Sequence, residues 1–293
     1  MAESADAEAL LHRADGERRL ALLIIENKEG PELASAVTHL RNAADGYQQA
    51  GWSDRRAECL QQLGRLQLRR SQPAEAAAAF AEALGLHRAA GDTQSAIAAA
   101  TGAADAHRLQ GEYDQALRRA EEAVSLAEEL GDHLRLASSR HAFGLVRLAR
   151  EELAAAQEPV ELALATYEAY KKDLERAGCH ECLAQIRMGL DDPDGCREHY
   201  EVCLAIATEA GRSHDVAAAL SRWADLALRH QRHDIARDVL DRCVALHRNN
   251  RNNDLLANFY SLDAVERLRT IADVRLNGTD TPLAGAALVE AAQ

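Results

Sequence analysis

The chain has 293 residues, of which 47% are hydrophobic and only 4% aromatic, and its formal net charge at pH 7 is −13. Its apolar residues are mostly Ala and Leu, which favour helices, whereas the β-branched and aromatic runs that mark strands are missing. Because nucleic-acid backbones and anionic membrane surfaces attract basic faces, this acidic balance argues against both as partners.

The beginning of the chain and its cysteines bear on the cellular compartment. Residues 1–19 are acidic and lack the apolar core of a signal peptide. The six cysteines are scattered through the chain rather than concentrated as in a small disulfide-stapled domain. We therefore expect a soluble, cytoplasmic protein with reduced thiols.

The predicted elements are helices joined in pairs by short turns. In chain order, the sequence predicts helix pairs within residues 13–52, 53–92, 93–132, 133–172, 173–212 and 213–252. At Gly91-Asp92 and Gly131-Asp132, Gly should end one helix in the left-handed conformation and Asp should cap the next. A capping helix is expected over 253–276, which completes an array over 1–276. Residues 277–293 are either a tail or a short second capping helix.

Side-chain size repeats every forty residues. Three columns stay small, namely Ala36, Ala76, Ala116, Ala156, Cys196 and Ala236; Ala43, Ala83, Ala123, Ala163, Cys203 and Cys243; and Gly64, Ala104, Gly144, Ala184, Ala224 and Ala264. A fourth column is large, with Leu40, Phe80, Val160, Tyr200 and Leu240, and with Ala120 as its exception. Because two helices approach closely only where facing side chains are small, these columns predict the packed faces of successive helix pairs.

The order of these sizes within one copy points to a family. Leu63, Gly64, Ala76, Phe80 and Ala83 resemble the pattern of the tetratricopeptide repeat, and the likeness recurs over about residues 13–270. The period of forty exceeds the family's usual length of about 34, as in the long-helix variety of kinesin light chains and bacterial peptide sensors. The resemblance implies an all-α, right-handed α-solenoid of about six to seven helix-turn-helix repeats.

The resemblance also implies that the first helix of each pair lines a concave groove for a protein or peptide partner. The groove positions carry over to Glu58, Gln61, Arg65, Arg69, Thr101, Asp105, Arg108, His141, Leu145, Glu181, Gln185, Met188, Ser221, Asp225 and Arg229. Among them, Arg65, Arg69 and Arg108 form a basic end that would suit an acidic or carboxylate-ended peptide.

The function that this pattern favours is a non-catalytic scaffold that binds a peptide or helix of a partner protein, with no cofactor and no metal. A ligand-gated regulator that senses a small peptide is the alternative. A more remote alternative is a metal or redox site at Cys179 and Cys182, which lie three residues apart in a predicted helix. Against it, a zinc site needs four ligands, and Cys179 falls in a column of small residues shared with Cys59 and Ala99.

Overall fold

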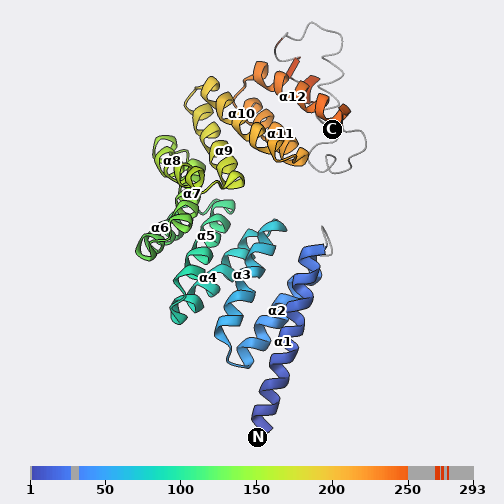
Figure 1. Cartoon of the computed structure of the whole chain (residues 1–293), viewed down its shortest axis with the longest axis vertical. Helices are drawn as coiled ribbons and strands as arrows, with labels where there is room; N and C mark the ends of the chain where they lie inside the picture. Colours follow the sequence, from blue (N-terminus) through green and yellow to red (C-terminus); the bar gives the residue numbers. More distant parts are fainter. Residues whose placement is uncertain (1, 28–32, 250–267, 271, 274–275, 277–293) are drawn as a thin grey trace. The chain divides into compact units, whose positions relative to one another are not determined.

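The computed structural model describes residues 2–27, 33–249, 268–270, 272–273 and 276, and every regular element within them is a helix (Figure 1). In chain order these are α1 (Ala2–Asn27), α2 (Leu33–Gln49), α3 (Ser53–Arg69), α4 (Pro73–Ala90), α5 (Thr93–Leu109), α6 (Tyr113–Leu130), α7 (His133–Ala149), α8 (Leu153–Ala169), α9 (Asp173–Gly189), α10 (Pro193–Glu209), α11 (Ser213–Arg229) and α12 (His233–Asn249).

From residue 33 onward these helices lie within the predicted residue ranges, whereas at the start of the chain they differ from the prediction. There α1 begins at Ala2, because the stretch before residue 13 is rich in Ala, Glu and Leu and holds no Pro or Gly that would stop a helix. Of the predicted capping helix, the structure describes residues 268–270, 272–273 and 276, all helical. Ala264 and the predicted tail lie outside the described residues.

Each of the described turns contains one residue in the left-handed conformation. These residues recur every twenty positions, with φ between 53° and 76°: Gly51, Ser71, Gly91, Gly111, Gly131, Glu151, Lys171, Asp191, Gly211 and Gln231. The predicted Gly-Asp stops are confirmed, since the carboxylates of Asp92 and Asp132 accept hydrogen bonds from the backbone N–H groups of Ser95 (3.1 Å) and Arg135 (3.0 Å). The even spacing of turns keeps helix lengths constant, so equivalent residues face the same neighbours in each copy.

The predicted columns form the core. In the column that begins at Ala36, every member through Ala236 is fully buried, and the large residues from Leu40 through Leu240 are no more than 1% exposed. The small residues are required by close contact: a Cβ added at Gly64 would lie 2.9 Å from the ring of Phe80. Burial of these apolar faces between successive helices is what stabilises the array.

The chain divides into two compact units, Met1–Thr166 and Tyr167–Gln293. In the first unit, α1 to α6 pack in sequence order and α7 packs on both α5 and α6. In the second unit, α9 to α12 pack in the same way around Trp223, which stacks on Tyr200 with ring centroids 5.3 Å apart. One continuous array over both units stays a prediction.

Candidate functional site

The predicted groove residues of the first unit lie on α3, α5 and α7. Arg65 and Arg69 are one turn apart on α3, both are exposed, and neither has a partner among the described residues. Two unpaired guanidinium groups on one face can each donate several hydrogen bonds to a carboxylate or carbonyl. This pair is the strongest recognition feature of the predicted set in the first unit.

Other charged groove residues of this unit are already paired. Arg108 contacts Asp105 one turn earlier on α5, and Glu58 of α3 lies 2.6 Å from the guanidinium of Arg18 on α1. The predicted basic end is therefore smaller than expected: Arg65 and Arg69 are free to bind, while the charge of Arg108 is balanced within its own helix. The spacing of three residues along one helix favours this pair, although both residues were predicted to line the groove.

Three of the predicted groove residues are buried and face the core instead. Gln61 is 9% exposed and its side-chain oxygen lies 3.2 Å from the His87 ring of α4, while Met188 and Ser221 are 3% and 8% exposed. Their side chains are covered by neighbouring helices and are unavailable to a partner. The remaining predicted positions are accessible in part or in full: Thr101, His141, Leu145, Gln185 and Asp225 are half-buried, and Arg229 is exposed.

In the second unit, Glu181 lines a hollow of about 250 Å³ between α9, α10 and α11. Its carboxylate lies 2.5 Å from the guanidinium of Arg222 on α11. Burial raises the pKa of Glu181, and Arg222 opposes that shift. The rim carries further charge from Arg212 and Asp215, whereas the floor is apolar, with Ile206 and the neighbouring alanines of α10 and α11. Such a partly desolvated ion pair beside an apolar floor suits a ligand that has both polar and apolar groups.

Sequence reasoning did not single out Arg222. Its counterparts in the forty-residue register are Gln62, Gly102, Ala142 and Cys182, all of them uncharged. A lone charge in an otherwise uncharged column was therefore a usable signal. It was missed because the family's groove positions assign Ser221, the preceding residue, to the lining.

The cysteines lie in the core. All six are buried, Cys182 included, and none forms a disulfide. Burial raises the pKa of Cys179 to about 12, so that thiol stays protonated at neutral pH and is a poor metal ligand or nucleophile. Within the described residues, no group of three or more His, Cys, Asp or Glu side chains is arranged to hold a metal ion. The metal or redox alternative thus gains no support from the geometry of α9.

Comparisons with known proteins bear on the fold. Residues 95–169, which span α5 to α8, match a family model described as a tetratricopeptide repeat. Residues 95–169 thus contain tetratricopeptide repeats. A search of curated proteins finds no match to the chain. In the described part of this repeat protein, no helix combines the length and the apolar character needed to cross a membrane.

Solved structures show the same fold over most of the repeat array. The chain is similar to the nearly identical TPR-like repeats of a putative kinesin light chain from Podosopora anserina, with a TM-score of 0.55, 18% identity, and coverage of 68% of this chain and 97% of that one. It is also similar to the apo form of RapI, with a TM-score of 0.63, 15% identity, and coverage of 90% and 98%.

A third similar structure is a Rap protein complexed with Competence and Sporulation Factor. It has a TM-score of 0.61 and 14% identity, and the match covers 90% of this chain and 77% of that one. At such identities these likenesses establish the helical repeat fold, and they say nothing further of what this chain binds.

Proposed function

We propose that the protein is a non-catalytic interaction scaffold whose first helices bind a peptide or helix of a partner protein. Repeat arrays of this fold offer long surfaces built from equivalent helix faces, and such surfaces suit extended or helical segments. The described residues hold no cluster with metal-ligand geometry, and the cysteines are buried.

The observation that carries the proposal is the exposed, unpaired state of Arg65 and Arg69 on α3. Most arginines of the described chain are paired with a carboxylate, as Arg56 is with Glu82, and the net charge of −13 supplies acidic groups in excess. Two adjacent arginines that no described carboxylate neutralises are a binding surface for an acidic segment or a terminal carboxylate, through charge-assisted hydrogen bonds.

The proposal is tested by affinity capture from lysate of the source cells, with retained proteins quantified by mass spectrometry. The test variant is Arg65→Glu/Arg69→Glu. The matched control is Arg41→Glu/Arg118→Glu, because Arg41 of α2 and Arg118 of α6 are also exposed and without a described partner but lie on second helices. We expect a partner that wild type and control retain and that the test variant loses, while circular dichroism shows equal helicity in all three.

A second candidate function is a regulator that takes a small peptide into the hollow beside Glu181 and Arg222. The apolar residues of that hollow and its half-buried ion pair favour it. The similar Rap protein is complexed with Competence and Sporulation Factor, and a factor bound in a comparable way would suit this second function. The capture experiment separates the two functions, because a sensor of this kind would retain no protein that depends on Arg65 and Arg69.

A further inference from the structure

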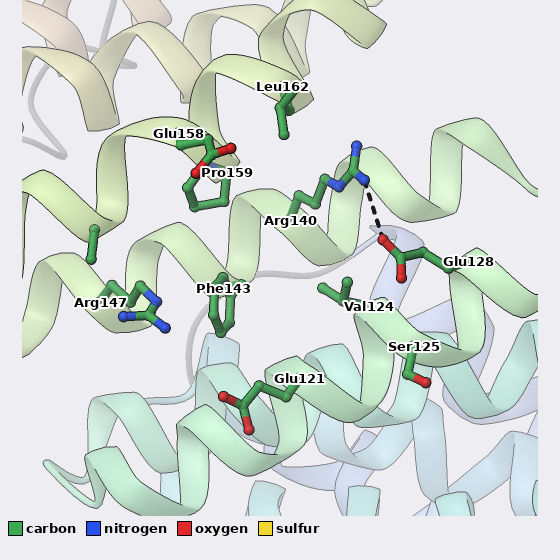
Figure 2. A pocket seen from close by; sticks show the side chains of 11 residues that line it. Glu121, Val124, Ser125, Glu128, Arg140, Phe143, Arg147, Glu158, Pro159 and Leu162 are labelled. Atoms are coloured by element: carbon green, nitrogen blue, oxygen red, sulfur yellow. Dashed lines mark hydrogen bonds and ion pairs between the residues drawn. The ribbon is translucent and has the colours of Figure 1, made fainter.

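A larger groove lies in the first unit, between α6 and α8 with α7 as its floor, and it has a volume of about 470 Å³ (Figure 2). We call it the α6–α8 groove. Its floor residues on α7 are Arg140, Phe143 and Arg147, which span about two helical turns. At about 100° per residue, they lie on nearly the opposite side of α7 from the predicted groove residues His141 and Leu145. The α6–α8 groove is therefore a separate surface.

The groove is open because the fourth copy lacks a packing contact that the second, third, fifth and sixth copies make. At the position of Phe143 those four copies carry Leu63, Ala103, Leu183 and Trp223, which are all no more than 5% exposed, whereas Phe143 is only half-buried. At the position of Arg140 the same four copies carry Leu60, Ala100, His180 and Leu220, all buried. Arg140 stands where these copies carry a buried side chain, and Phe143 is only partly covered by its neighbours. An apolar surface is therefore left exposed.

The walls add more apolar surface. Leu162 of α8 is 44% exposed at a position where the other copies carry Asn42, Glu82, Glu122, Val202 and Arg242. Pro159, on the same wall, has no N–H, so the carbonyl of Ala155 cannot receive its usual helical hydrogen bond from that position. The α8 wall of the groove thus adds the apolar side chains of Leu162 and Pro159.

The arginines of the groove are paired with carboxylates, whereas two of its glutamates are not paired with any described residue. Arg140 lies 3.2 Å from Glu128, and Arg147 lies 3.0 Å from Glu152 while its guanidinium carbon sits 4.5 Å from the centre of the Phe143 ring. Both arginines are therefore engaged. Glu121 on the α6 wall and Glu158 on the α8 wall are exposed and have no partner among the described residues. Figure 2 shows them on either side of Phe143. The free charge of the groove is negative on both walls.

From these contacts we infer that the α6–α8 groove binds a helical segment of a partner protein that carries a large apolar side chain beside Lys or Arg. The apolar side chain would cover Phe143 and Leu162. The ammonium or guanidinium group would bind Glu121 or Glu158. This chemistry is the reverse of that proposed for Arg65 and Arg69, so the two surfaces select different segments.

The test uses two labelled, Ala-rich helical peptides that each carry Leu and differ only four residues later, where one has Lys and the other Glu. Each is titrated with the full chain by fluorescence anisotropy. We expect the Lys peptide to bind about tenfold or more tightly than the Glu peptide, and Glu121→Gln/Glu158→Gln to bring the two affinities within about twofold of each other. Both substitutions are at exposed positions, so folding is preserved.

A second variant tests the apolar contact. Leu162→Asn should weaken binding of both peptides, whereas the matched control Leu109→Asn, at a leucine that is 52% exposed outside the groove, should not. Arg65→Glu/Arg69→Glu should leave peptide binding unchanged, which separates this inference from the proposed function. Equal affinities for the two peptides, no binding of either, or a preference that survives Glu121→Gln/Glu158→Gln would overturn it. Self-association of the chain that Leu162→Asn abolishes would assign the groove to a second copy and overturn it as well.

Discussion

His180 of α9 lies against His199 of α10, with their Nδ1 atoms 3.0 Å apart. At this separation one ring must donate and the other accept, so at least one of the two imidazoles must be neutral and the pair is lost when both are protonated. Burial, together with the positive charges of His199 and Arg176, lowers the pKa of His180 from 6.5 to about 4. In the unfolded chain the same group takes up a proton near pH 6.5, so the contribution of the pair to stability depends on pH.

The direction of this pH dependence follows from the lowered pKa of His180, which is a basic group. The stabilising contribution is present above pH 6.5 and is lost as pH falls toward 4. Over this range we expect the unfolding free energy of wild type to fall by about 2–3 kcal/mol more than that of His180→Leu. Leucine is chosen because it stands at the same position of the repeat in two other copies, as Leu60 and Leu220. Urea unfolding at a series of pH values measures the difference. The exposed His230→Gln should behave as wild type, and parallel curves for wild type and His180→Leu would refute the expected role of His180.

Lys171 occupies the left-handed turn position between α8 and α9 with φ of 53°, where Gly111 and Gly131 serve other turns. A side chain in this conformation is strained, and glycine relieves the strain at the expense of a more flexible unfolded chain. Lys171→Gly should therefore raise the unfolding free energy by about 0.5–1 kcal/mol. Lys172→Gly is the matched control, because φ there is −93° and glycine brings only flexibility. Equal effects of the two changes would argue against the left-handed turn.

At the scale of the helix pair, the small columns decide how closely helices approach. Ala116 of α6 is fully buried and its neighbours in the core include Ala104 and Ala120. Ala116→Leu should overpack this contact and lower the unfolding free energy by about 1–3 kcal/mol. The neighbouring Gln115 is exposed, so Gln115→Leu keeps the helix propensity and adds no buried volume. If both variants unfold at the same urea concentration, the repeat register of α6 is wrong.

Helices, turns and core columns were predictable because each depends on residue type at a fixed spacing. At Gly91-Asp92, Gly ends one helix and Asp caps the next. A small residue stands at the position of Ala36 in every later helix pair. The α6–α8 groove was not predictable in this way. It arises where Arg140 replaces a buried residue and Phe143 keeps the expected size without a cover. Arg140 marks the place as a lone arginine in its column, but the uncovered state of Phe143 has no counterpart in the type of that residue.

The burial of individual groove positions was also beyond the sequence. The family pattern assigns Gln61 and Met188 to the lining, but whether a side chain points outward depends on the rotation of each long helix against its neighbours. Arg65 and Arg69 remain exposed on α3, and Arg108 turns to Asp105. Pairing among nearby charges is decided by side-chain geometry rather than by position in the repeat.

At the scale of the whole molecule, two units of the same repeat present several surfaces with different chemistry. The first unit carries unpaired arginines on α3 and an acidic, apolar groove between α6 and α8, while the second unit carries the hollow at Glu181. Surfaces of opposite charge favour different segments, so a scaffold of this kind can distinguish its partners by charge. The central claim is that partner binding depends on the first helices.

The most direct test of that claim is the amount of each captured protein retained by Arg65→Glu/Arg69→Glu relative to wild type, with Arg41→Glu/Arg118→Glu beside it. The account predicts at least one partner whose retention falls about tenfold or more in the first variant and is unchanged in the second. Partners that all remain at wild-type levels in the first variant, or that fall equally in both, would contradict binding through the exposed arginines of α3.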